Sequence, residues 1–179
     1  MQRNFRKRLP PARSNDTLAK GEADIQVRIE IDDVSRPQVL ALLEEHLRNM
    51  HDISPPNQVF AFDAHKLRDV VFWTAWQDDL PPGCVALKEI SPVQGELKSM
   101  RTSPNARRRG VGRALLGHIL DVSRQRGYRE LLLETGSHPE FLPAQALYRS
   151  VGFQECGPFG TYQDNGFSVF MSLLLEPKG

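Results

Sequence analysis

The stretch ELKSMRTSPNARRRGVG, at residues 96–112, joins a strand pattern to a helix start within a chain of 179 residues. Residues 96–102 predict a strand, and the turn-forming SPN at residues 103–105 predicts its end. Helical spacing of apolar residues resumes from Gly112 onward. We therefore expect the arginine- and glycine-rich loop at residues 107–112 to lead directly into the N-terminus of a helix.

This loop, RRRGVG, has the features of an anion site. The first N–H groups of a helix that begins near Gly110 lack intrahelical partners and carry the positive end of the helix dipole. Gly110 and Gly112 have no Cβ, so a phosphate can approach the backbone closely, and Arg107, Arg108 and Arg109 add positive charge. The loop lacks the Lys-Ser/Thr pair of a P-loop and the third glycine of a dinucleotide fingerprint. From the motif alone, a basic surface turn is the alternative.

Alternating and helical patterns predict the first elements of the chain. Apolar residues alternate with polar ones and predict a half-buried strand at Ile25, Val27, Ile29 and Ile31. Ser35 and Pro37 then predict a helix start. The apolar face of that helix is predicted to consist of Leu40, Leu43, Leu47 and Met50.

A hairpin is predicted after this helix. Residues 51–66 carry two prolines and an asparagine and predict a loop, whereas VVFWTAW at residues 70–76 predicts a strand. The Pro-Pro-Gly sequence within residues 80–83 predicts a turn, and residues 84–90 predict the second strand.

The C-terminal half alternates between strands and helices. Helical spacing is found at Leu115, Ile119 and Val122, with Gly127 as the predicted stop. We expect strands at residues 131–135 and 167–175, and a short helix at residues 143–151 closed by Gly152. The order of the predicted strands and helices along the chain predicts an α/β (α+β) fold. Its mixed sheet is expected to have an antiparallel N-terminal half and a parallel strand–helix–strand crossover in the middle.

Composition limits the classes of function. The length fits one domain, which we place at residues 25–179, after a polar, basic and flexible tail at residues 1–24. A net charge of +1 argues against a nucleic-acid partner, and no apolar run is long enough to cross a membrane. Cys84 and Cys156 match no ligand spacing, and no two histidines do, so we expect reduced thiols, a cytoplasmic location and no metal.

Three elements together resemble the GNAT superfamily of acetyltransferases. Arg107-x-x-Gly110-x-Gly112 resembles the pyrophosphate motif of that superfamily, and ELKSMRT lies just upstream, where the superfamily has its central strand. Downstream, AQALYRSVGF at residues 144–153 resembles its A-x-x-LY-x-x-x-GF helix and turn. The resemblance covers roughly residues 25–175 and implies the GNAT fold, with flanking helices and two splayed parallel strands in the middle of the sheet.

Shorter segments narrow the resemblance to the bacterial YsnE-like N-acetyltransferases. These segments are ELKSMRT, LETGS at residues 133–137, FLPAQALY at 141–148, CGPF at 156–159, SVFM at 168–171 and SPP at 54–56. One departure is Phe141, which occupies a position where many superfamily members have an asparagine that contacts the cofactor.

The resemblance implies that acetyl-coenzyme A is the co-substrate. Its pantetheine arm is expected between the two splayed strands, paired with the backbone of Met100 and Thr102, and its pyrophosphate on the loop. The cofactor-binding residues implied in this way are Met100, Arg101, Thr102, Arg107, Arg108, Arg109, Gly110, Val111, Gly112, Arg113, Thr135, Ala144 and Tyr148.

The resemblance also implies three catalytic groups. The backbone N–H of Met100 would bind the oxyanion of a tetrahedral intermediate. Glu96 would accept the proton of the amine, directly or through water, or else form a structural ion pair with a neighbouring lysine or arginine. Tyr148 would protonate the departing thiolate, or else pack in the core beside Leu147 and Phe153.

The acceptor is expected to be the primary amine of a small molecule. The resemblance implies a site built from residues 50–62 and 159–167, including Met50, Phe62 and Tyr162. Lys98 and Arg101 are expected either to meet a carboxylate of an amino-acid-like amine or to be surface charges. The alternatives are an acetyl-CoA sensor without turnover and a protein or peptide N-acetyltransferase, and a homodimer is possible by analogy.

Overall fold

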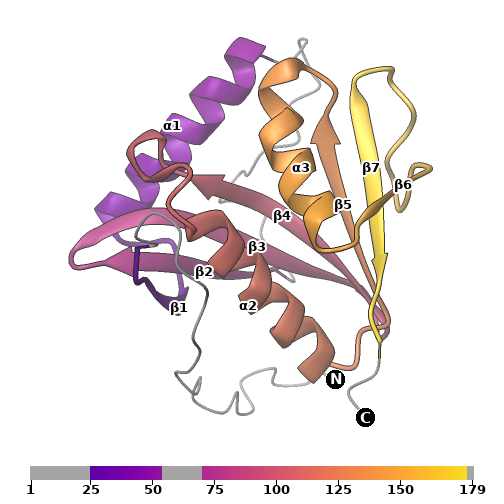
Figure 1. Cartoon of the computed structure of the whole chain (residues 1–179), viewed down its shortest axis with the longest axis horizontal. Helices are drawn as coiled ribbons and strands as arrows, with labels where there is room; N and C mark the ends of the chain where they lie inside the picture. Colours follow the sequence, from indigo (N-terminus) through magenta and orange to yellow (C-terminus); the bar gives the residue numbers. More distant parts are fainter. Residues whose placement is uncertain (1–24, 54–69, 177–179) are drawn as a thin grey trace.

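The computed structural model describes residues 25–53 and 70–176 (Figure 1). The predicted tail at residues 1–24, Phe62, SPP at 54–56 and most of the loop predicted at 51–66 lie outside the described residues. Its strands are β1 (Arg28–Asp32), β2 (Val70–Gln77), β3 (Leu80–Ser91), β4 (Gln94–Thr102), β5 (Glu130–Gly136), β6 (Gln154–Cys156) and β7 (Ser168–Leu174). Its helices are α1 (Pro37–Ile53), α2 (Val111–Gln125) and α3 (Leu142–Ser150), with 3₁₀ turns η2 (Pro104–Ala106) and η3 (Pro139–Phe141).

The strands form one mixed sheet in the order β1-β2-β3-β4-β5-β7-β6. Strands β1 to β4 pair as antiparallel neighbours, whereas β4 and β5 are parallel and are connected through α2. Strand β7 then inserts antiparallel between β5 and β6. The predicted antiparallel N-terminal half and central parallel crossover are thereby confirmed.

The two parallel strands separate along their length, as Figure 1 shows for β4 and β5. Among the described residues, their pairing runs only from Gln94 with Glu130 to Leu97 with Leu133. Strand β4 continues to Thr102 and β5 continues to Gly136 beyond this point. The predicted splay is therefore present, and it opens between the C-terminal halves of the two strands.

Two apolar clusters cover the two faces of the sheet. The larger contains Trp73, Val85 and Leu97 and packs under α2 and α3; we call this side the α2 face. The smaller contains Phe72, Cys84 and the buried side of α1, and we call this side the α1 face. Because side chains alternate along a strand, neighbouring residues of β2 and β3 contribute to opposite clusters.

The buried side of α1 differs from the predicted one. Its buried residues are Val39, Leu42, Leu43 and His46, whereas Leu40 is 38% exposed. The spacing of apolar residues in α1 is consistent with burial of either the predicted or the observed side of the helix. The contact with Phe72, Trp76 and Cys84 decides which side is buried. In β1, Ile31 is 51% exposed because it lies near the end of an edge strand, while Asp32 is buried on the α1 face.

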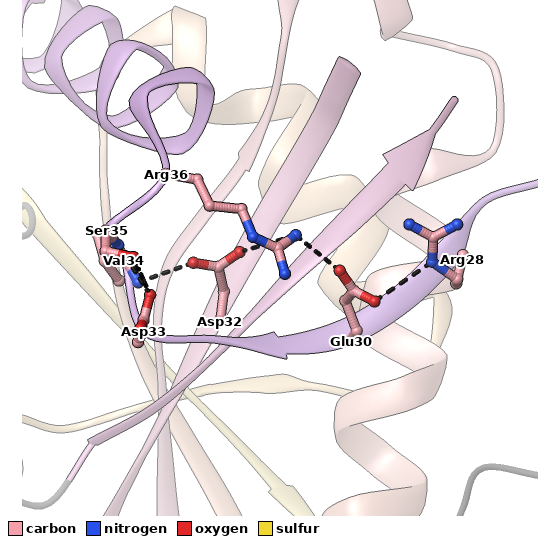
Figure 2. A network of polar contacts seen from close by, with 7 residues as sticks. All are labelled: Arg28, Glu30, Asp32, Asp33, Val34, Ser35 and Arg36. Carbon is pink, nitrogen blue, oxygen red and sulfur yellow. Dashed lines mark hydrogen bonds and ion pairs between the residues drawn. The ribbon is translucent and has the colours of Figure 1, made fainter. Parts of the chain in front are cut away.

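Polar contacts between β1 and the start of α1 set the position of this helix (Figure 2). The Arg36 guanidinium donates a 2.7 Å hydrogen bond to Glu30 and lies 3.7 Å from the buried Asp32 carboxylate. It also lies 4.7 Å from the ring centroid of Trp76. Asp32 in turn accepts a 2.7 Å hydrogen bond from the backbone N–H of Val34. These contacts fix the first turn of α1 over the sheet.

The turn predicted at residues 80–83 is wrong, and so is the omission of β6. The chain turns at Asp78 and Asp79 instead, with Asp78 at φ 52°, and Pro81 and Pro82 lie inside β3. The β2–β3 register shifts beside these prolines, between Ala75 and Gln77. A bulge tolerates proline because the ladder is interrupted there, so Pro-Pro-Gly is not restricted to turns.

Candidate active site

A bulge in β4 determines which way the central side chains point. Cys84 pairs with Arg101 and Ala86 pairs with Lys98, so β4 has one residue more than β3 between these pairs. Ser99, in that interval, has φ 50°, and its carbonyl accepts a hydrogen bond from the Cys84 thiol. Glu96, Lys98 and Arg101 consequently lie on the α1 face, although simple alternation would place Arg101 on the opposite face.

The predicted anion loop has the expected backbone. Gly110 caps α2 at φ 81°, a left-handed conformation that glycine adopts without strain, and Arg108 has φ 61°. The arginine side chains at 107–109 are exposed. The first intrahelical bond runs from Ala114 N to Gly110 O, so the N–H groups of residues 111–113 belong to the open first turn. The residues of this open turn are Val111, Gly112 and the exposed Arg113.

Gly112 faces the end of β4 and the side of α3. A Cβ at Gly112 would lie 3.2 Å from Leu147 Cδ2, 3.5 Å from Thr102 Oγ1 and 3.6 Å from Met100 Cε. The structure thus brings Met100, Thr102 and the start of α2 together on the α2 face. Ala144, also on α3, packs against the same cluster, and Thr135 is buried on β5.

On the α1 face, Glu96, Lys98 and Tyr162 form a compact polar group. Glu96 Oε1 lies 2.7 Å from both Lys98 Nζ and the Tyr162 hydroxyl, and Lys98 Nζ lies 2.7 Å from that hydroxyl. Burial and the Glu96 carboxylate raise the pKa of Tyr162. The ion pair considered as the alternative role of Glu96 is therefore present, and its Oε1 already accepts two hydrogen bonds.

A second carboxylate, Glu134, completes this group. It lies on β5 opposite Phe170 of β7, and Ser168 Oγ lies 2.6 Å from its Oε1. The pKa of Glu134 is raised from its ordinary 4.5 to about 7, chiefly by burial and to a smaller extent by the charge of Glu96, against the opposing effects of Ser168 and Lys98. A carboxyl group with such a pKa can accept and release a proton near neutral pH.

The sequence pattern predicts no role for Glu134. The residue appeared only inside the LETGS segment, because one glutamate in an apolar strand does not reveal which residues bury it. The parallel register supplies the missing information: Glu96 pairs with Leu132, so Glu134 is the next residue of β5 on the same face. The register of β4 against β5 was the signal that would have identified it.

Tyr148 lies on the other side of the opening. Its side chain is buried on the α2 face, and its ring packs edge-to-face against Phe153 at 5.9 Å between centroids. Burial raises the pKa of Tyr148, and the negative charge of Glu134 raises it further. The predicted packing with Phe153 is confirmed, and the electrostatic influence of Glu134 reaches this hydroxyl across the splayed strands.

The remaining predicted residues are more widely placed. The Arg101 side chain lies beneath α1 beside Glu45, on the face opposite Met100. Met50 is half-buried near the end of α1, and Phe62 is outside the described residues. Phe141 packs edge-to-face on Phe167, at 5.9 Å between centroids.

Comparison with known proteins agrees with this geometry. Residues 37–153 match the family model described as the acetyltransferase (GNAT) family. The chain belongs to the GNAT acetyltransferase family. Like other GNAT proteins, it is an acyltransferase of a family that uses acetyl-CoA, and the splayed strands and the glycine-capped helix occupy the positions implied by the sequence resemblance.

Two relatives and one solved structure show how far the similarity extends. The chain is 47% identical to the uncharacterized N-acetyltransferase YsnE of Bacillus subtilis over 83% of the chain and all of YsnE. It is 43% identical to YedL, an uncharacterized N-acetyltransferase of Escherichia coli, over 82% of the chain and 94% of YedL. A structure described as an acyl-CoA N-acyltransferase from Klebsiella pneumoniae is 26% identical to this chain, with a TM-score of 0.68. The match covers 84% of this chain and 98% of the Klebsiella chain.

Two further findings concern the described ranges only. No three metal-binding side chains gather there in a group that could hold an ion. No helix in the same ranges is long and apolar enough to cross a membrane.

Proposed function

We propose that this protein transfers the acetyl group of acetyl-CoA to the primary amine of a small molecule, by direct attack through a tetrahedral intermediate. The observation that carries the proposal is the opening between β4 and β5. On its α2 face lie Met100, Gly112 and Tyr148, and on its α1 face lie Glu96 and Glu134. Donor and acceptor can therefore approach from opposite faces and meet where the strands separate.

The donor side is supported by the N-terminus of α2 and the exposed edge of β4. The N–H groups at residues 111–113 and the arginines at 107–109 bind and orient the pyrophosphate. The backbone of Met100 and Thr102 holds the pantetheine arm, because β5 no longer pairs with this part of β4. The Met100 N–H stabilises the oxyanion.

The acceptor side supplies proton transfer. An amine enters as an ammonium ion and must lose a proton before it attacks. Glu134, with a pKa of about 7, accepts this proton, while Glu96 positions Lys98 and Tyr162 beside it. Glu96 as the base, directly or through water, is the alternative assignment. Tyr148 is protonated at neutral pH, as any tyrosine with a pKa of about 10 or above would be, and its hydroxyl can donate this proton to the departing thiolate. The second proton of the amine nitrogen, lost as the intermediate collapses, restores the hydroxyl through solvent.

Replacing Tyr148 with phenylalanine is expected to lower kcat about 100-fold, with little change in the KM for acetyl-CoA. The ring would still pack against Phe153, so the fold should persist. Thiol release from acetyl-CoA measures the rate, and thermal unfolding checks stability. Unchanged turnover in this variant would exclude Tyr148 as the acid.

Acetyl-CoA at about 100 times its Kd is expected to add about 2.7 kcal/mol to the free energy of unfolding. For a chain of this size, the midpoint of thermal unfolding should rise by roughly 5–10 °C. Acetyl-pantetheine, which lacks the pyrophosphate, is the matched control and should give a much smaller shift because the loop has nothing to bind. The absence of a shift at saturating acetyl-CoA, together with no thiol release over an amine panel, would overturn the proposed function.

A further inference from the structure

A buried guanidinium lies under α1 with an incomplete set of partners. Arg101 is 7% exposed, yet neither its Nε nor its Nη2 has a hydrogen-bond partner in the part of the chain that the structure describes. Burial lowers the pKa of Arg101, and the positive charge of Arg107 adds to this effect. Buried charged donors are normally satisfied, because each unmade hydrogen bond carries a desolvation cost.

The two unsatisfied nitrogens are the pair that binds a carboxylate. Nε and Nη2 lie on one edge of the planar guanidinium, and this edge offers two parallel N–H donors. A carboxylate accepts both in a bidentate arrangement, which is the strongest and most directional contact that arginine makes. A neutral amide offers one acceptor oxygen and no charge, so it satisfies the same edge poorly.

A carboxylate of the protein already approaches this edge. Glu45 Oε1 lies 3.6 Å from Arg101 Nη2, which is close enough for an ion pair and too long for a hydrogen bond. The Glu45 side chain is 40% exposed, so it reaches Arg101 from the solvent side. His46, the next residue of α1, is buried, and its pKa is lowered to about 4 by burial and by the charge of Arg101. It is therefore neutral and adds no competing charge.

The position of Arg101 suits a contact with the acceptor. The β4 bulge places it on the same face as Glu96 and Lys98, and it lies three positions after Lys98, which corresponds to at most roughly 10 Å along the strand. Lys98 is already engaged with Glu96 and Tyr162. Of the two basic residues that the sequence singled out for a carboxylate, the structure therefore favours Arg101.

We propose that the acceptor amine carries a carboxylate, which binds the Nε–Nη2 edge of Arg101 in exchange for Glu45. This inference rests on the proposed function, because it names the substrate class of the same site. The α1 face then binds both ends of the acceptor: Arg101 holds the carboxylate, and the group around Glu96 and Glu134 receives the amine.

The test compares amino acids with their own primary amides. A set of α-, β- and γ-amino acids and the matching amides is assayed by thiol release from acetyl-CoA with the wild type, Arg101→Gln and Arg101→Lys. The wild type should prefer at least one acid over its amide by on the order of 100-fold in kcat/KM, because two charged hydrogen bonds are lost with the amide. Arg101→Gln should bring this ratio close to one, and Arg101→Lys should restore only part of it. Because the ratio compares two acceptors in one variant, any effect of the substitution on acetyl-CoA binding is the same for both acceptors and cancels.

Glu45→Gln provides the matched control on the opposite side of the pair. It removes the internal competitor without touching Arg101, so the preference for the acid should rise. A binding readout covers the case in which Arg101 variants unfold: in the presence of CoA, the preferred acid should raise the unfolding temperature of the wild type more than its amide does.

The outcomes separate the two proposals. Equal kcat/KM for acids and amides in the wild type, with measurable turnover, overturns the carboxylate site and leaves the acetyltransferase proposal intact. An acid preference that survives in Arg101→Gln also overturns it. If no amine is turned over but acids still stabilise the wild type more than amides, the pocket is supported and the proposed reaction fails.

Discussion

Replacing Glu134 with glutamine is expected to lower kcat/KM for the amine by between about 100-fold and 10,000-fold, the range typical for the loss of a general base. Glutamine keeps the size of the side chain and an oxygen that can accept from Ser168. It removes the group whose pKa of about 7 suits proton transfer near neutral pH. Thiol-release kinetics with a fixed acceptor measure the effect.

The pH profile identifies the base. In the wild type, kcat/KM should rise with pH and level off above about pH 7, as Glu134 loses its proton. In Glu134→Gln, kcat/KM should show no such rise with pH. Glu96→Gln is the comparison variant. If kcat/KM no longer rises with pH in Glu96→Gln but still does so in Glu134→Gln, the proton acceptor is Glu96 and our assignment is wrong.

Stability offers an independent check on Glu134. Its pKa is raised from 4.5 to about 7 in the folded protein, so folding favours the protonated form. The resulting loss of folding stability is absent below about pH 4.5, grows between about pH 4.5 and 7, and stays constant at higher pH. At pH 8, Glu134→Gln should therefore be more stable than the wild type, by at most about 3 kcal/mol at about 1.4 kcal/mol per pKa unit. A loss of activity combined with a gain in stability would separate catalysis from folding.

Gly83→Ala is expected to destabilise the protein by about 3 kcal/mol. A Cβ at Gly83 would lie 2.6 Å from the carbonyl oxygen of Arg101, 2.9 Å from Val111 Cγ1 and 3.0 Å from Leu115 Cδ1. The nearest of these atoms belongs to the backbone, so a change of rotamer cannot relieve the clash. The first turn of α2 must move away from β3 and β4, which should also weaken acetyl-CoA binding. Thermal unfolding with and without acetyl-CoA measures both effects.

Gly117→Ala is the matched control for this substitution. Gly117 lies inside α2, and a Cβ there would have nothing within 4 Å. Alanine in a helix interior is favoured over glycine, so this variant should be more stable than the wild type by up to about 1 kcal/mol. If both variants lost stability equally, close packing at Gly83 would not be the cause.

Local patterns predicted most elements because short-range chemistry decides them. Helix α2 was predicted from its apolar spacing and its flanking glycines, and the structure confirms both limits at Gly110 and Gly127. Strand β2 followed from its β-branched and aromatic residues. The turn at 80–83 was wrong because proline fits a bulge as well as a turn, and only pairing with β2 distinguishes the two.

The candidate site was predictable in part for the same reason. The anion loop is a local feature, because one short segment supplies the backbone conformation, the glycines and the arginines. Glu96 and Tyr162 are 66 residues apart, and their hydrogen bond depends on how the chain before β7 folds back over β4. The raised pKa of Glu134 depends on burial by other elements, which no window of sequence contains.

The sequence by itself determined the glycine-capped helix start and the strand that precedes it, where we propose that the donor binds. Only the tertiary structure decided the acceptor side. The extra residue at Ser99 turns Arg101 to the α1 face, and the parallel register brings Glu134 beside Lys98 and Glu96. The physical reason is that the face a strand residue occupies depends on bulges and on pairing with distant strands, whereas a helix start depends on its own neighbours.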